Sequence, residues 1–155
     1  MRSSTAEEEA AFLQALGLLV VTFGALEDSL RDAILIGAGG QDQMIPMLTA
    51  GMAFRALIDK FGAMCVCTRP PLRTSADIQP LCNVLNAIND DRNRLVHATW
   101  TSSGPAGVPR RYKMSANARN GLRLNPQDVP VSDILALVSR IEDADRKIWE
   151  IVAAA

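Results

Sequence analysis

The sequence has 155 residues, of which 48% are hydrophobic and only 5% aromatic, and its formal net charge is -1 at pH 7. This length fits a single domain over residues 1–155, and a core of aliphatic side chains with few rings favours helices over a sheet sandwich. The charge excludes a globally basic nucleic-acid-binding protein, although it leaves room for a local basic patch.

The first predicted element is a long helix that ends near Ile36, with its N-cap within residues 3–5. Its apolar side chains recur at three- and four-residue steps, namely Phe12, Leu16, Leu19, Val20, Phe23, Leu26, Leu30 and Ile34. The glycine-rich run 37–40 predicts its end. Residues 1–10 are too polar for a signal peptide, and charged residues such as Glu27 interrupt the apolar run. We therefore expect a cytoplasmic protein with no membrane partner.

Two shorter segments come next. Residues 41–50 are expected to form a short helix or an irregular segment, with Pro46 near its first turn. Helical spacing of apolar side chains predicts a helix over residues 53–67, which Pro70-Pro71 ends. The three cysteines are Cys65, Cys67 and Cys82. Their spacing and the single histidine do not suit a metal site, so we expect reduced packing residues and no cofactor.

The next helix is predicted to begin near Ala76, after an N-cap at Thr74 or Ser75, with Pro80 in its first turn. It carries an apolar stripe of Leu81, Val84, Leu85 and Ile88. It also carries a polar stripe of Asn86, Asn89, Asn93 and His97, the only histidine of the chain. The next positions on this apolar face are occupied by the charged residues Asp91 and Arg92. Such groups are costly to bury without partners, so this stretch indicates a paired or functional site.

A small β-hairpin is predicted after Trp100, because Arg111–Met114 and Leu122–Leu124 alternate around Asn120-Gly121. No acid lies between Asp91 and Asp128, whereas that interval contains seven cations: Arg92, Arg94, Arg110, Arg111, Lys113, Arg119 and Arg123. Two interpretations stay open, a solvated hairpin face and a phosphate-facing rim near His97.

The last predicted helix follows Pro130 and has Ser132 as its N-cap. Its predicted buried face consists of Ile134, Leu137, Val138, Ile141, Ile148, Trp149 and Val152. The predicted architecture is therefore mainly α, a bundle of four to five helices with a hairpin before the last one.

Chemistry is best supported at Arg92, Asn93 and His97. Arginine grips a phosphate through a bidentate fork, and histidine moves protons near neutral pH. Together they suffice for metal-free cleavage of RNA, whose 2′-hydroxyl is a built-in nucleophile. Arg92 and His97 lie about 140° apart on an ideal helix. Two copies around a two-fold axis would therefore bring the groups together better than one copy.

Simpler roles for the charged residues are also open. Glu27 is the predicted structural partner of Arg92, in an interhelical ion pair that would be compatible with catalysis. Asp90 and Asp91 are expected to be helix-face or ion-pair residues. Tyr112 is expected to be a cross-strand residue of the hairpin.

The segment Arg92-Asn93-Arg94-Leu95-Val96-His97 resembles the Arg-(four to six residues)-His motif of the HEPN domain superfamily, in its Arg-Asn-x-x-x-His form. Trp100 and the stretch 23–27 also resemble single-domain bacterial members. The resemblance implies a bundle of four to five helices and, for many members, a metal-independent endoribonuclease built as a homodimer. Several members are toxins of toxin–antitoxin or anti-phage systems. Thr99 stands where members paired with a nucleotidyltransferase antitoxin have tyrosine, so that type of regulation is not implied.

Carried over to this chain, the resemblance implies that Arg92 and His97 are catalytic and that Asn93 orients them or the phosphate. The nearby cations predicted to bind substrate are Arg94, Arg110, Arg111 and Lys113. The expected partners are RNA, a second copy of the chain, and an antitoxin or regulatory protein. The rival hypotheses are a catalytically silent module that binds a nucleotide, an RNA or a protein, and a bundle in which Arg92 and His97 serve packing alone.

Overall fold

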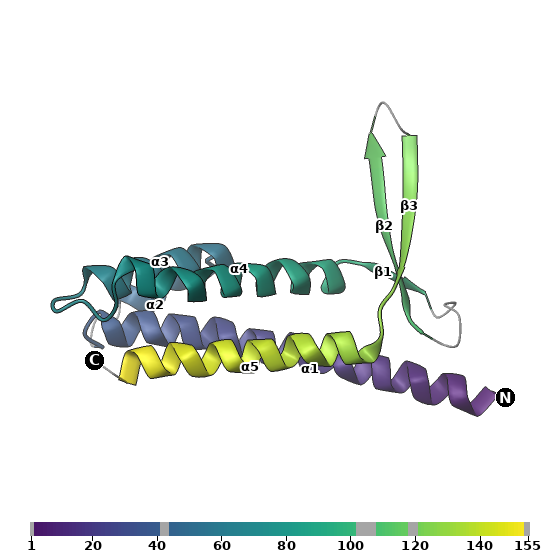
Figure 1. Ribbon diagram of the computed structural model, residues 1–155, viewed down its shortest axis with the longest axis horizontal. Coiled ribbons are helices and arrows are strands. Elements are labelled where there is room, and N and C mark those ends of the chain that lie inside the picture. Colours follow the sequence, from purple (N-terminus) through teal and green to yellow (C-terminus); the bar gives the residue numbers. More distant parts are fainter. Residues whose placement is uncertain (1, 41–43, 102–107, 118–120, 154–155) are drawn as a thin grey trace. The chain divides into compact units, whose positions relative to one another are not determined.

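In the computed structural model of the chain, residues 2–40, 44–101, 108–117 and 121–153 are described, with the backbone alone for 2–5, 101, 113–117 and 121–124. Within these ranges the chain has five helices and a three-stranded antiparallel sheet, which precedes the last helix (Figure 1). This confirms the predicted mainly α fold and the position of its small β element.

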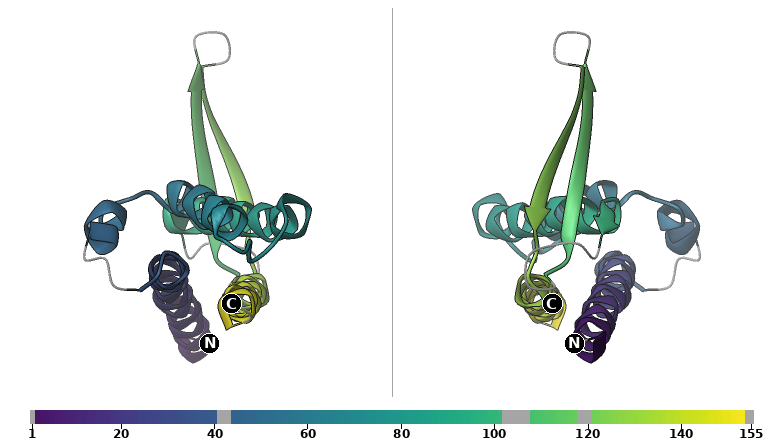
Figure 2. Two further views of the ribbon diagram at one scale, coloured as in Figure 1. Left: turned by 90° about the vertical axis from the view of Figure 1, so that its left-hand side faces the viewer. Right: turned by 90° about the vertical axis from the view of Figure 1, so that its right-hand side faces the viewer.

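The helices are α1 (Arg2–Gly37), α2 (Met44–Thr49), α3 (Phe54–Cys67), α4 (Ser75–Val96) and α5 (Val131–Ala153). The strands are β1 (Thr99–Thr101), β2 (Arg110–Asn117) and β3 (Gly121–Asp128), and β2 pairs with both of the others. Both views in Figure 2 show β2 and β3 side by side. The predicted hairpin is thus present, and the short strand β1 extends it into a sheet.

Three details at helix starts differ from the prediction. α1 begins at Arg2, so residues 3–5 lie inside the helix instead of capping it. α5 begins at Val131, so Ser132 is already helical. Pro80 falls in the second turn of α4, where its ring removes a backbone donor that the helix would otherwise use. The hydrophobic pattern locates a helix well but locates its first residue less well.

Two helix ends are as predicted. Thr74 caps α4, because its Oγ accepts a hydrogen bond from the Asp77 N–H at 3.2 Å. α1 ends at the glycine run, where Gly40 donates to the Leu35 carbonyl at 2.9 Å. Gly39 and Gly40 have φ values of 103° and 71°, a backbone conformation that side chains with a Cβ rarely adopt.

The described chain divides into two compact units that are not consecutive in sequence. The first contains Met1–Val20 and Asp91–Val138, and the second contains Val21–Asp90 and Ser139–Ala155. Helices α1, α4 and α5 contribute residues to both units. The prediction of a single domain stays a prediction.

The core of the first unit includes an aromatic contact between Phe12 of α1 and Trp100 of β1. Their ring centroids are 4.7 Å apart and the rings are tilted by 59°. Other buried apolar side chains of this unit are Ala15, Leu19, Leu95, Val129, Ile134, Leu137 and Val138. β1 is therefore held by its packing as well as by its pairing with β2.

The core of the second unit is larger and mostly aliphatic. Phe23 of α1 and Phe54 of α3 have ring centroids 4.6 Å apart. Its fully buried large side chains include Leu26, Leu30, Leu57, Ile58, Phe61, Leu85, Ile88, Ile141 and Ile148. Trp149 is half-buried and donates from its indole N–H to the Ser29 hydroxyl at 3.3 Å. The predicted buried faces of α3 and α5 are confirmed, and so is that of α4 except at Val84, which is exposed.

α1 has an apolar exposed side as well as a buried one. Leu13, Leu18, Val20 and Val21 are exposed. The segment Ala6–Gly37 is long enough to cross a membrane, and its most apolar 18-residue window has a mean hydropathy of 1.8 and is 28% buried. A core helix of a soluble protein meets the same criteria, so the cytoplasmic location stays a prediction.

The cysteines differ in accessibility: all three are free thiols, with Cys65 and Cys82 buried and Cys67 exposed. Burial, together with the neighbouring Cys82, raises the pKa of the Cys65 thiol to about 11. Burial also raises the pKa of Cys82.

We expect iodoacetamide at mildly alkaline pH to modify Cys67 alone in the folded protein. The thiolate is the reactive form, and both burial and a raised pKa suppress it at the other two thiols. Intact mass and peptide mapping would show one modification, and three after unfolding in urea. Rapid modification of Cys65 in the folded protein would contradict this packing.

Candidate active site

The motif lies at the C-terminal end of α4, within the first unit. His97 directly follows Val96, the last residue of the helix, and its backbone N–H donates to the Asn93 carbonyl at 3.1 Å. The helical hydrogen-bond pattern thus continues to His97. Its side chain is exposed, as a group that transfers protons to and from a bound substrate must be.

Asn93 joins the two ends of the motif. Its side-chain Oδ1 accepts a hydrogen bond from Arg92 Nη1 at 2.9 Å, while its carbonyl accepts the N–H of His97. Arginine has only donors, so the side-chain oxygen of Asn93 must be the acceptor. The guanidinium of Arg92 is therefore linked to Asn93, which lies on the same helix face as His97.

Two side chains from the sheet cap the end of α4. The last carbonyls of a helix have no partner inside the helix and need one elsewhere. Trp100 Nε1 donates to the Leu95 carbonyl at 3.0 Å. Arg111 Nη1 donates to the Arg94 carbonyl at 3.2 Å. The cation of Arg111 also suits the negative end of the helix dipole.

A groove opens beside this helix end, with a volume of about 590 Å³. It is lined by Asn93, Arg94, His97, Ala98, Thr99, Arg111, Tyr112 and Gln127. The predicted residues Asn93, His97, Arg94 and Arg111 are thus brought together. Arg92 does not line the groove itself but is hydrogen-bonded to Asn93, which does.

No family model, curated protein or solved structure matches this chain.

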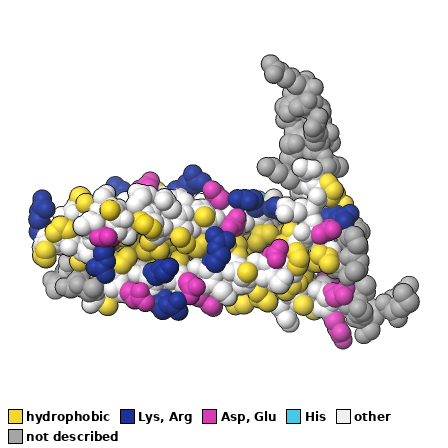
Figure 3. All heavy atoms as spheres, in the orientation of Figure 1, with side chains coloured by type: hydrophobic (Ala, Val, Ile, Leu, Met, Phe, Trp, Pro, Cys, Tyr) yellow, Lys and Arg dark blue, Asp and Glu magenta, His cyan; other side chains and the backbone are white. Residues whose placement is uncertain are grey.

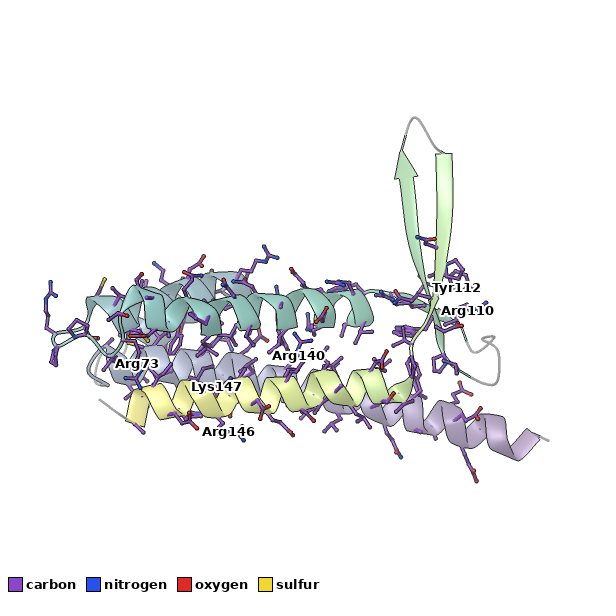
Figure 4. The ribbon with its side chains drawn as sticks, in the orientation of Figure 1. Arg73, Arg110, Tyr112, Arg140, Arg146 and Lys147 are labelled. Carbon is purple, nitrogen blue, oxygen red and sulfur yellow. The ribbon has the colours of Figure 1, made fainter. Side chains whose placement is uncertain are left out.

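The other predicted binding cations are placed differently. Arg110 forms a two-pronged ion pair with Asp128 across the strands, at 2.6 and 3.2 Å. Successive residues of a strand point to opposite faces, so Arg110 and Arg111 point to opposite faces of the sheet. Figure 4 labels Arg110 and Tyr112 at the end of β2 that is distant from the 118–120 connection. The side chain of Lys113 lies outside the described residues.

Asp91 and Asp128, which lie at the two ends of the acid-free interval, form ion pairs with cations inside it. Asp128 pairs with Arg110, and Asp91 lies 3.3 Å from Arg94. On the face shown in Figure 3, basic and acidic side chains are interspersed along the described surface. The solvated-pair interpretation therefore fits both Arg110 and Arg94, whereas the phosphate-facing interpretation of Arg94 and Arg111, which line the groove, stays a prediction.

We expect Asp128→Asn to lower the melting temperature slightly at neutral pH and to have no effect in acid. The hydrogen bond from Arg110 lowers the pKa of Asp128, so this pair stabilises the fold above the ordinary carboxyl pKa of 3.8. That contribution is lost as pH falls through the lowered value. Melting curves of both proteins from pH 7 downward would converge at low pH. A difference that persists in acid would contradict the ion-pair explanation.

The acids predicted to form ion pairs near the motif differ in whether the structure shows their partners. Glu27 belongs to the second unit and Arg92 to the first, so their pairing stays a prediction. Asp90 pairs with Arg55 of α3 at 2.6 Å, which confirms it as an ion-pair residue, as Asp91 is. Among the described residues, no group of three or more His, Cys, Asp or Glu side chains could hold a metal ion.

Gln127 and Thr99 line the groove, although neither is among the site residues predicted from the sequence. Gln127 pairs with Arg111 across β2 and β3, and its side-chain Oε1 accepts from Arg111 Nε at 3.0 Å and also from Nη2. The register, in which Asn117 pairs with Gly121, places Gln127 opposite Arg111, whereas the sequence predicted a hairpin without its register.

Proposed function

We propose that the chain is a metal-independent endoribonuclease of the HEPN type, with a composite site formed by two Arg-x4-His motifs in a homodimer. The observation that supports it best is the groove at the end of α4, where exposed His97 lies with Arg94 and Arg111. Arg92 is attached to the same site through Asn93. A proton-transfer group and guanidinium groups beside one open groove are what phosphodiester cleavage in RNA requires.

In the proposed reaction the 2′-hydroxyl attacks the adjacent phosphorus, and the bond from phosphorus to the 5′-oxygen breaks. One imidazole accepts the proton of the 2′-hydroxyl, and another donates a proton to the leaving 5′-oxygen. The guanidinium of Arg92 stabilises the negative charge that builds on the phosphoryl oxygens. The products are a 2′,3′-cyclic phosphate and a free 5′-hydroxyl.

A second copy of the chain completes this chemistry. Each copy contributes one imidazole, because the chain has a single histidine, whereas the reaction uses an acid and a base. Two copies around a two-fold axis would supply two imidazoles and two copies of Arg92 to one cleft. Because an active ribonuclease endangers its host, we further propose a toxin or defence role with an inhibitory protein as partner.

The test is cleavage of single-stranded RNA by the purified protein in the presence of EDTA. We expect cyclic-phosphate ends by mass spectrometry, and no cleavage at a position where the 2′-hydroxyl is replaced by hydrogen. A well-folded dimer that leaves all tested RNAs intact would exclude the nuclease.

The alternative is a silent module that binds RNA, a nucleotide or a protein through the same groove. The arginines of the groove favour this alternative. Arg94 forms an ion pair and Arg111 forms side-chain hydrogen bonds, so the groove contains more cations than proton-transfer groups. This module would bind RNA saturably without turnover, and Arg92→Ala would abolish binding.

A further inference from the structure

We infer that Arg111 is a positioning residue, which fixes the end of α4 to the sheet and thereby directs the imidazole of His97 into the groove. This role goes beyond substrate binding, which the sequence predicted for Arg111, and it rests on the proposed function for its kinetic consequence alone.

Arg111 makes three hydrogen bonds inside the protein. Its Nη1 donates to the Arg94 carbonyl at 3.2 Å, and its Nε and Nη2 both donate to Gln127 Oε1. A guanidinium has five N–H donors, so these contacts use three of them. A side chain held at three atoms is fixed in direction as well as in position.

The carbonyl that accepts from Arg111 Nη1 lies close to His97 along the chain. Arg94 precedes His97 by three residues, which is close to one helical turn, and His97 is the first residue beyond α4. Trp100 holds the adjacent Leu95 carbonyl, and its ring packs on Phe12. Hydrogen bonds from side chains of β1 and β2 therefore fix the last turn of α4. The position of this turn determines where the side chain of His97 points.

The planar guanidinium of arginine is needed to make all three hydrogen bonds. Lysine keeps the charge but is a single-point donor, and it cannot reach the Arg94 carbonyl and Gln127 Oε1 with the same geometry. Gln127→Leu retains the arginine at position 111 but removes the oxygen on β3 that accepts its hydrogen bonds from Nε and Nη2. Arg111→Lys and Gln127→Leu should therefore have the same effect on His97 by different routes.

The experiment observes His97 directly, because its imidazole resonances are the only histidine signals of the native sequence. Nitrogen-15 imidazole spectra are recorded without RNA for Arg111→Lys, Gln127→Leu and the control Arg146→Lys. Arg146 is an exposed arginine of α5 that pairs with Asp143 at 2.5 Å, away from the groove residues in sequence and outside the first unit. Any affinity tag must lack histidine.

We expect the His97 resonances to move toward those of an unstructured histidine and to sharpen in both groove variants, and to be unchanged in Arg146→Lys. In cleavage assays both groove variants should lower kcat by about 100-fold while KM changes little, because a misdirected group loses rate more than ground-state binding.

Wild-type His97 resonances in a folded Gln127→Leu protein would overturn the inference, even if Arg111→Lys fails to fold. A large rise in KM at unchanged kcat would also overturn it, because that pattern describes substrate binding. If wild-type protein cleaves no RNA but the resonances respond as expected, the positioning role stands and the proposed function is excluded.

Discussion

Replacing His97 with alanine should lower the rate of RNA cleavage by about 10²- to 10⁴-fold, the range that a positioned acid or base contributes. The fold should be almost unaffected, because His97 is exposed and its described hydrogen bond comes from the backbone N–H, which alanine retains. A change in stability within about 0.5 kcal/mol is typical of such surface positions. Cleavage rates and thermal melting of the two proteins, measured in EDTA, would test both halves of this expectation.

A matched control is Gln79→Ala, an exposed residue of the same helix that donates to Asn83 at 2.9 Å. It should leave both the rate and the melting temperature near the wild-type values. The purely structural hypothesis predicts the opposite pattern for His97→Ala, a changed melting temperature with an unchanged rate. That result would remove His97 from the catalytic chemistry.

Mixing wild-type protein with an excess of His97→Ala should suppress cleavage. A mixed dimer holds two copies of Arg92 but a single imidazole in the shared cleft, so it lacks either the acid or the base of the reaction. After subunit exchange with about a ninefold excess of the variant, only about a tenth of the wild-type copies pair with each other, and we expect the rate to fall about tenfold. The loss should require subunit exchange, induced by brief unfolding and refolding.

Differently tagged copies would show by co-purification that mixed dimers have formed, and wild-type protein carried alone through the same exchange is the control. Mixed dimers without any loss of rate would show that each copy acts with its own Arg92 and His97. A chain that is monomeric at all concentrations by light scattering would exclude the composite site.

The part of this protein that its sequence determined is local. Hydrophobic spacing located all of the longer helices, and the glycine run after α1 and Thr74 before α4 were found from residue type. These features depend on side chains within a few positions of each other, so the pattern carries them directly. The motif itself could be found for the same reason, because Arg92, Asn93 and His97 all belong to one helix end.

The surroundings of the motif were decided by the tertiary structure. The short strand β1 has no signal of its own, and it forms because Trp100 packs on Phe12 and pairs with β2. Hairpin register depends on the turn, and the register placed Gln127, which no local pattern singled out, opposite Arg111. Arg110 and Arg111 are adjacent and chemically identical, yet the alternation of the strand gave one an ion pair and the other a place in the groove. Their different roles follow from pairing between segments distant in sequence, which residue spacing along one segment does not contain.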